Sequence, residues 1–251
     1  MVTAYQAAGY DFCALSDHNT FNYVDFFPLV TDPEIPGILF IVGVEANCND
    51  VGSGHVHYVC VGGITEQIVS IVSQTVIVSV DWAHIAHPMA VDWGGITQAE
   101  IEALTGVYAL VIREETGYEL WDALLTNKTQ IYGISEDDSH AVAEVGTRGW
   151  IVVYADALAW ANILASLQAG KFYASDGPVI SAITEDGSKL TITTTTNCNF
   201  TFYGRDSTVY GYKANSTSVA YAYDGKEGYI RCYIVEVGTN KRAWTNAIMF
   251  S

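Results

Sequence analysis

The chain has 251 residues, half of them apolar and only 16% charged, so it can bury a full core and is neither disordered nor fibrous. Its 28 acidic and 11 basic side chains give a formal net charge of −17, which disfavours wrapping of nucleic acid and binding to anionic membranes. The five cysteines are widely spaced and form no CxxC pair, which argues against a disulfide framework or a zinc ribbon.

Strand-like and helix-like patterns alternate over the first two-thirds of the chain. Buried strands are expected at residues 11–15, 37–44, 56–61 and 131–135. Helices are expected at residues 66–73, 98–104, 120–125 and 157–169. Gly170 is placed to end the last helix as a C-cap glycine does. This alternation predicts a mainly parallel α/β sheet or barrel.

After about residue 183 the sequence becomes rich in threonine and tyrosine and alternates with period two. Strands are expected at residues 190–196, 200–203, 218–223 and 228–237. They are separated by the turn pairs Asp186-Gly187, Asp224-Gly225 and Thr239-Asn240. We therefore predict two domains, residues 1–183 and residues 184–251, and expect the second to be a small antiparallel, β-sandwich-like module.

The sequence contains no apolar stretch long enough to cross a bilayer, and its first nine residues do not form a signal peptide. We therefore expect a cytoplasmic protein, or a secreted or periplasmic one if a leader upstream of Met1 was lost.

Histidine and acidic residues recur where the predicted strands begin or end. The candidates are Asp17, His18, Glu45, His55, His57, His87, Asp138 and His140. In parallel α/β folds, catalytic groups gather at strand ends, so these side chains suggest one shared metal-binding pocket. Imidazole and carboxylate ligands suit zinc, manganese or iron. Bound cations would also let so acidic a chain hold a small phosphorylated substrate.

Each candidate also has a simple structural interpretation. A single histidine is more often a surface or core residue than a ligand, and Asp17-His18 could form a helix N-cap. His87-Pro88 could be only a turn, and Asp137-Asp138 could be a solvated loop. The conjunction of all of them favours the metal site.

Five motifs, in sequence order, are similar to those of a known family. They are Ala8 to Thr20 with its Ser-Asp-His, Gly43-Val-Glu45, Gly54-His55, Ala86-His-Pro88 and Gly133 to His140. Together with the segments 120–125 and 169–178, they resemble the metal-dependent phosphoesterase branch of the PHP (polymerase and histidinol phosphatase) superfamily. The similarity covers about residues 1–183, and Arg242 to Asn246 resembles the end of a β module found in some members.

The resemblance implies a distorted (β/α)7 barrel that holds up to three metal ions at the strand C-termini. Glu45 would bridge two ions, His55 and His87 would complete one of those sites, and Asp138 would serve the other. His18 and His140 would share a third ion. His57 is the alternate to His55, because it points to the same face of the strand.

Two other residues have lesser roles in this interpretation. Asp17 would orient His18 or a water. His84 matches no ligand position, and we expect it to be structural.

The chain departs from the family at its start, because it lacks the opening His-x-His strand and the Asp that follows it. We therefore expect an N-terminally truncated barrel with one well-held metal, a second held weakly, and reduced activity. The neighbour of the missing strand would be an open edge, which makes a homodimer conceivable.

The function expected from the resemblance is hydrolysis of a phosphomonoester or phosphodiester by metal-activated water. His140 or His18 would assist proton transfer if not fully occupied with metal, and Arg148 and Lys171 are candidate substrate contacts. Two alternatives stay open. One is a catalytically impaired barrel that binds partners through its β module, and the other is a metal hydrolase of non-phosphate bonds.

Overall fold

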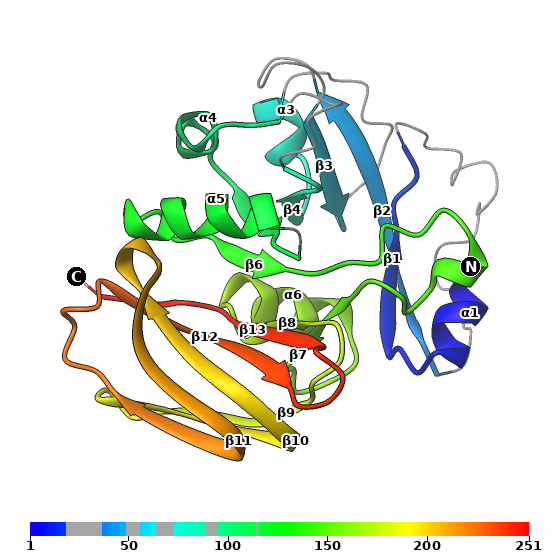
Figure 1. Cartoon of the computed structure of the whole chain (residues 1–251). Coiled ribbons are helices and arrows are strands. Elements are labelled where there is room, and N and C mark those ends of the chain that lie inside the picture. The colour runs from blue at the N-terminus through cyan, green and yellow to red at the C-terminus, as the bar shows by residue number, and fades with distance from the viewer. Residues whose placement is uncertain (19–36, 49–55, 64–72, 89–94, 114, 251) are drawn as a thin grey trace.

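The computed structural model describes residues 1–18, 37–48, 56–63, 73–88, 95–113 and 115–250. Within these residues the chain forms two β-sheets flanked by a small number of helices (Figure 1). None of the helices in the described ranges is long and apolar enough to cross a membrane.

The first sheet has six strands arranged in chain order. They are β1 (Phe12–Leu15), β2 (Leu39–Cys48), β3 (Val56–Val61), β4 (Trp82–Ile85), β5 (Val107–Val111) and β6 (Tyr132–Ile134). The pairs β1-β2, β4-β5 and β5-β6 are parallel, whereas β2-β3 and β3-β4 are antiparallel. The helices that accompany this sheet are α1 (Val2–Ala7), α3 (Ser73–Ile77), α4 (Gln98–Ala103), α5 (Glu115–Thr126) and α6 (Trp160–Gln168).

The two faces of this sheet bury different side chains, because successive residues of a strand point to opposite faces. One face contributes Val44 and Leu110 to a cluster with Trp121 of α5. The other contributes Ile41 to a cluster with Ile163 of α6. The sheet is therefore packed on both faces, and α5 and α6 cover opposite sides of it.

The second sheet has eight strands in the order β11-β10-β12-β13-β8-β7, with β9 paired to β10 and β14 paired to β12. All of its pairings are antiparallel. The strands are β7 (Trp150–Val153), β8 (Phe172–Ser175), β9 (Ile180–Glu185), β10 (Lys189–Gly204), β11 (Thr208–Ala222), β12 (Tyr229–Glu236), β13 (Arg242–Thr245) and β14 (Ile248–Met249).

The prediction of a (β/α)7 barrel is wrong, because the described strands form two sheets and β7 and β8 belong to the second. Residues 49–55 are all that separates β2 from β3, and a parallel crossover needs a dozen or more residues. The two strands therefore pair antiparallel, as a hairpin does. The helix α6 lies between β7 and β8, yet these strands also pair antiparallel, and β8 continues the sheet by pairing with β13.

Most of the predicted segments appear as the expected type of element. The expected strands at 11–15, 56–61 and 131–135 correspond to β1, β3 and β6, and the expected helices at 98–104 and 157–169 correspond to α4 and α6. Gly170 follows α6 with φ +68°, which is the left-handed conformation of a C-cap glycine. The predicted helix at 66–73 lies outside the described residues except for its last position.

A buried polar cluster joins the C-terminal strands to α5. Arg231 on β12 is 1% exposed, and its Nη2 donates to Asp122 Oδ1 on α5 at 2.8 Å. Tyr118 and Tyr229 also contact this pair, through hydrogen bonds to the guanidinium and to the carboxylate. The guanidinium carbon lies 4.4 Å from the centre of the Tyr118 ring, a cation–π distance.

The side chain of Asn246, which follows β13, makes a second set of hydrogen bonds to the rest of the molecule. Its Oδ1 accepts from the Gly133 N–H of β6 at 3.1 Å, and its Nδ2 donates to the carbonyls of Gly170 and Phe172. Because β7 and β8 share a sheet with the C-terminal strands, the sheets do not follow the predicted division at residues 183 and 184. That domain boundary stays a prediction.

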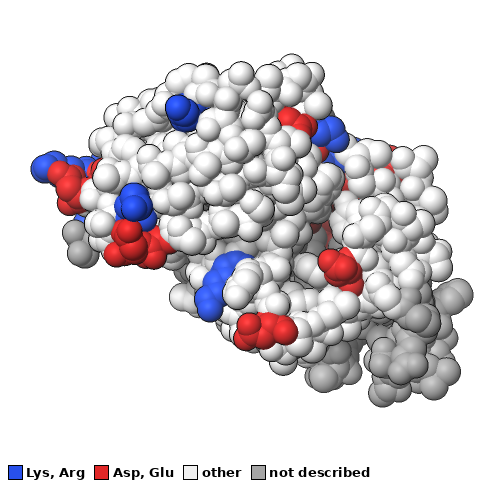
Figure 2. Space-filling model, turned by 90° about the horizontal axis from the view of Figure 1, so that it is seen from below, with Lys and Arg blue, Asp and Glu red and all other residues white. Residues whose placement is uncertain are grey.

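Charged side chains are sparse on the face seen from below (Figure 2). Most of the acidic and basic groups there lie next to a group of opposite charge, and they form no single large patch (Figure 2).

Candidate metal centre

Strands β2, β3 and β4 place ionisable side chains on the face of the first sheet that carries Ile41. Glu45 lies two pleats beyond Ile41 on β2, and His57 and His84 lie on the same face of β3 and β4. Glu45 and His57 are 6% and 3% exposed. Burial of acids and imidazoles is costly unless they are paired, so each of these side chains is expected to have a hydrogen-bonding or charged partner.

Three side chains converge on Glu45. His57 Nδ1 lies 2.7 Å from Glu45 Oε1, and His87 Nε2 lies 3.1 Å from the same oxygen. The two imidazole nitrogens are themselves 3.1 Å apart. His18 approaches the other carboxylate oxygen, with 3.7 Å between His18 Nε2 and Glu45 Oε2. One carboxylate is thus surrounded by three histidines from separate segments.

The backbone explains why His18 arrives at this point. Residues 18 and 45 form an isolated parallel bridge just beyond β1, so the two strands carry their side chains to the same level. His18 Nδ1 lies 3.3 Å from Asn47 Oδ1, one pleat further along β2. Sequence reasoning missed Asn47, although its spacing from Glu45 places both on one face of β2.

Two of the residues near Glu45 have left-handed backbone conformations. His87 has φ +29° and Asp138 has φ +48°. Such conformations are uncommon for residues other than glycine and cost on the order of 1–3 kcal/mol each. They occur here at the two turns that the sequence marks as ligand positions.

Electrostatics favour a charged carboxylate at the centre of the cluster. Burial by itself would raise the pKa of Glu45, but hydrogen bonds to His57 and His87 and the nearby His18 lower its pKa to about 2. The hydrogen bond to Glu45 raises the pKa of His87. The pKa of Asp138 is raised by burial and by the neighbouring Glu136 and Glu45.

The donor atoms fit a divalent cation. Ligand atoms of His18, Glu45 and His57 all lie within 4.8 Å of one another. Nitrogen and oxygen ligands bind zinc at about 2.0–2.2 Å, which places neighbouring ligand atoms about 3–3.5 Å apart. His57 Nδ1, His87 Nε2 and Glu45 Oε1 lie 2.7–3.1 Å from one another, which is close to that separation. The chemistry of the cluster therefore matches a metal, whose identity the donor set leaves open.

The pair Asp137-Asp138 has two separate roles. Asp137 is 4% exposed, and its carboxylate accepts from the backbone N–H groups of Gly146, Arg148 and Gly149 and from the Tyr10 hydroxyl. It holds a turn together and has no position left for a ligand. Asp138 instead carries the unusual φ and lies near His140, whose Nδ1 is 3.9 Å from Asp138 Oδ1.

His140 lies at the edge of the cluster. Its ring centre is 6.1 Å from that of His18, and its side chain is 67% exposed. It therefore lies beside His18 and has open access to solvent.

The remaining predicted residues are placed as follows. His55 lies outside the described residues, and its alternate His57 lies in the cluster. Asp17 is exposed, and its backbone carbonyl accepts from the Glu45 N–H at 3.1 Å. Arg148 Nη1 lies 3.2 Å from Asp138 Oδ2. Lys171 lines a separate hollow of about 240 Å³.

His84, expected to be structural, has a defined place beside the cluster. Its Nδ1 accepts from Trp82 Nε1 at 3.3 Å, and its Nε2 lies 2.9 Å from Glu136 Oε2. Sequence reasoning did not single out Glu136, because it stands next to two other acids and has no motif of its own.

Comparison with known proteins gives one structural likeness. No protein-family model matches the chain, and no curated protein matches it. Among solved structures, the chain is similar to a two-domain protein from Bacteroides vulgatus ATCC 8482 that contains a predicted PHP-like metal-dependent phosphoesterase. The two share 13% sequence identity, with 97% of this chain and 86% of that chain covered and a TM-score of 0.49.

Proposed function

We propose that the protein is a metal-dependent phosphoesterase whose centre is built on Glu45. The observation that carries this proposal is the convergence of imidazole nitrogens from His18, His57 and His87 on one buried carboxylate. Such a donor set, with one side facing outward, is typical of hydrolytic metal sites. The choice of a phosphate ester rests on the order of the five motifs described above.

Each residue of the cluster has a distinct task in this proposal. Glu45, His57 and His87 would hold the cation, and His18 would be a further ligand. The chemistry that a divalent ion would supply here is Lewis acidity and a lowered pKa of a bound water. Because Glu45 is ionised over the physiological range, it helps to offset the positive charge of that ion in a site with little solvent.

The exposed side of the cluster would handle the substrate. His140 lies near His18 and is open to solvent, so it can exchange protons with the leaving group and with bulk water. Arg148, half-exposed and paired with Asp138, can turn its guanidinium toward an anionic oxygen. Lys171 lines a different hollow, so we assign the contact with the anion to Arg148.

The test is hydrolysis of a chromogenic aryl phosphate by the full chain supplemented with manganese or zinc. Glu45→Gln and His87→Ala should each reduce kcat/KM at least about 100-fold, since each removes a ligand that the reaction requires. Glu119→Gln is the matched control, because Glu119 is an exposed acid on α5. We expect it to keep full activity.

Two outcomes would overturn the proposal. One is activity that survives both substitutions in the cluster. The other is a chain that binds no transition metal after supplementation. Hydrolysis of aryl esters or amides in place of phosphates would keep the metal centre but change the reaction class, since the same metal chemistry serves both.

A further inference from the structure

The three histidines that surround Glu45 differ in how tightly the fold confines them. The side chains of His57 and His87 are 3% and 24% exposed, whereas that of His18 is 43% exposed. Packing therefore restricts the His57 ring most and the His18 ring least. An exposed side chain keeps more of its rotamer freedom, and ordering it has an entropic cost. The orientation of His18 is thus the one that most depends on a specific contact.

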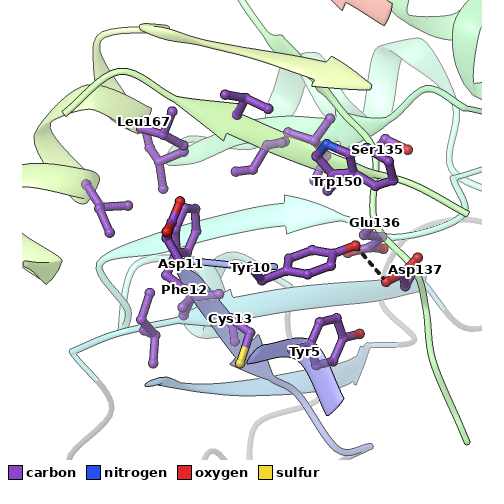
Figure 3. Close-up of a pocket in the computed structure, with 18 of the residues that line it drawn as sticks. Tyr5, Tyr10, Asp11, Phe12, Cys13, Ser135, Glu136, Asp137, Trp150 and Leu167 are labelled. Atoms are coloured by element: carbon purple, nitrogen blue, oxygen red, sulfur yellow. Dashed lines mark hydrogen bonds between the residues drawn. The ribbon is translucent and has the colours of Figure 1, made fainter. Parts of the chain in front are cut away.

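On another side of the cluster, hydrogen bonds supply such a contact. Figure 3 shows the hydroxyl of Tyr10 bonded to Asp137, the residue before Asp138. The Asp137 carboxylate also accepts from three backbone N–H groups in the turn at 146–149. Asp138 thus receives its backbone position from the side chain of its neighbour.

The backbone brings His18 to the level of Glu45 but does not set the direction of its ring. Residues 18 and 45 form an isolated parallel bridge, and the Glu45 N–H donates to the Asp17 carbonyl at 3.1 Å. These contacts place the Cα of His18, whereas they do not restrict its two side-chain torsions. Because the two ring nitrogens are distinct, a rotated ring would present a different atom to the carboxylate.

Asn47 supplies the contact that sets this direction. It lies one pleat beyond Glu45 on β2 and directly opposite His57 on β3, so it belongs to the face that carries the cluster. Its Oδ1 is 3.3 Å from His18 Nδ1, while the other ring nitrogen, Nε2, lies 3.7 Å from Glu45 Oε2. The His18 ring is thus held between an amide and a carboxylate.

The chemistry of these two contacts assigns the imidazole proton. A neutral imidazole has one N–H and one lone pair, and an amide oxygen only accepts. Nδ1 of His18 therefore carries the proton and donates to Asn47, which leaves the lone pair of Nε2 on the side of Glu45. A lone pair that faces a carboxylate oxygen requires a positive charge between them, and a metal cation supplies it.

We propose that Asn47 is the positioning residue that presents His18 Nε2 to the cation of the metal centre. The inference rests on the proposed function only in taking that centre to bind a divalent ion, and it holds whichever bond the ion serves to cleave. Histidine ligands commonly donate their second ring N–H to such a partner, and removal of the partner lowers metal affinity about 10–100-fold.

The experiment measures binding of cobalt(II) to the full chain by its visible absorption, which depends on the ligands around the ion. Asn47→Leu keeps the size of the side chain but removes the acceptor, so it should raise the Kd at least about tenfold. Asn47→Asp keeps an oxygen that can accept from Nδ1 and should bind cobalt at least as tightly as the parent chain. Asn197→Leu, at an exposed position of β10, is the same chemical change away from the centre and should have no effect.

A second background distinguishes positioning from other roles. In His18→Ala the ring that Asn47 orients is absent, so adding Asn47→Leu should change the Kd less than about twofold. If Asn47 were itself a ligand, or supported only the fold, the loss would be the same in both backgrounds. Urea unfolding of the metal-free variants shows that each is folded, and Asn47→Ala is a second variant that removes the acceptor without the bulk of leucine.

The proton on His18 gives a spectroscopic readout. In the zinc-loaded chain, long-range proton–nitrogen correlation spectra distinguish a metal-bound imidazole nitrogen from a protonated one. His18 should carry a proton on Nδ1 and none on Nε2. The reverse pattern would overturn the inference, because Asn47 would then face a nitrogen with no proton to donate.

The outcomes separate this inference from the proposed function. The expected cobalt affinities without hydrolysis of the aryl phosphate support the positioning role and reject the proposed reaction. An unchanged Kd in Asn47→Leu, or an equal loss with and without His18, overturns the positioning role alone. A parent chain that binds no cobalt rejects both.

Discussion

Glu45 depends on a histidine of β3, and the sequence offers two, His55 and His57, with the same orientation on a strand. His57 Nδ1 is 2.7 Å from Glu45. We predict that His57→Ala lowers the affinity for zinc or manganese at least about tenfold, whereas His55→Ala lowers it less. Equilibrium dialysis with metal analysis measures both. A larger loss in His55→Ala would place the ligand one pleat earlier.

A second matched pair separates the two adjacent acids. Four N–H and O–H groups donate to the Asp137 carboxylate, two to each oxygen. Asp137→Asn replaces one of these oxygens with an NH₂ group, so two of the donors lose their acceptor in a buried turn. It should lower the free energy of unfolding by on the order of 3 kcal/mol. Asp138→Asn should change stability little and impair hydrolysis. Urea denaturation and the aryl phosphate assay together test the pair, and the reverse pattern would contradict the assignment.

At the scale of single elements, Gly170 shows how one residue ends a helix. It has φ +68°, and a Cβ at this position would meet the Tyr132 ring at 2.5 Å. Gly187, at the turn before β10, has φ +83° but open space around it. We predict that Gly187→Ala lowers the free energy of unfolding by about 1 kcal/mol, because alanine is strained in this backbone conformation. Gly170→Ala should lower it by about 1–3 kcal/mol more, because the added Cβ also clashes with the Tyr132 ring. Thermal or urea unfolding compares them, and equal losses would contradict the clash.

The elements best predicted from the sequence are those marked by local signals. Asp186-Gly187, Asp224-Gly225 and Thr239-Asn240 all lie at turns between strands, because glycine and asparagine tolerate the left-handed conformations found there. The sequence marks the histidines and acids of the cluster because they recur near the predicted strand ends. In the structure Glu45 lies inside β2 and His57 lies at the start of β3, and the antiparallel pairing of these strands brings the two side chains together.

Strand direction and strand membership could not be predicted in this way. The expected second strand ended at residue 44, whereas β2 continues to Cys48, which shortens a connection that was already at the lower limit for a crossover before β3. Strands β4, β7 and β8 were not predicted; each has only four residues, which gives a weak periodic signal. Their partners in the sheets are set by tertiary packing.

At the scale of the whole molecule, the buried pair Arg231–Asp122 joins β12 to α5. Arg231→Met leaves the Asp122 carboxylate buried without its cation, so we expect a loss of about 3–5 kcal/mol in unfolding free energy. The double variant Arg231→Met/Asp122→Leu should recover part of that loss, because it removes both charges. Urea denaturation of the three proteins forms the test, and a double variant less stable than Arg231→Met would contradict it.

The pairing of β8 with β13 has a consequence for synthesis of the protein. Ser175 pairs with Ala243, which lies 68 residues further along the chain, so β8 can complete its ladder only after those residues have been synthesised. Until then, the nascent chain carries β7 and β8 as a hairpin-like pair with an unsatisfied edge, a state that favours association with other chains. Production of this protein should therefore respond to chaperone supply during translation, and early termination should yield insoluble product.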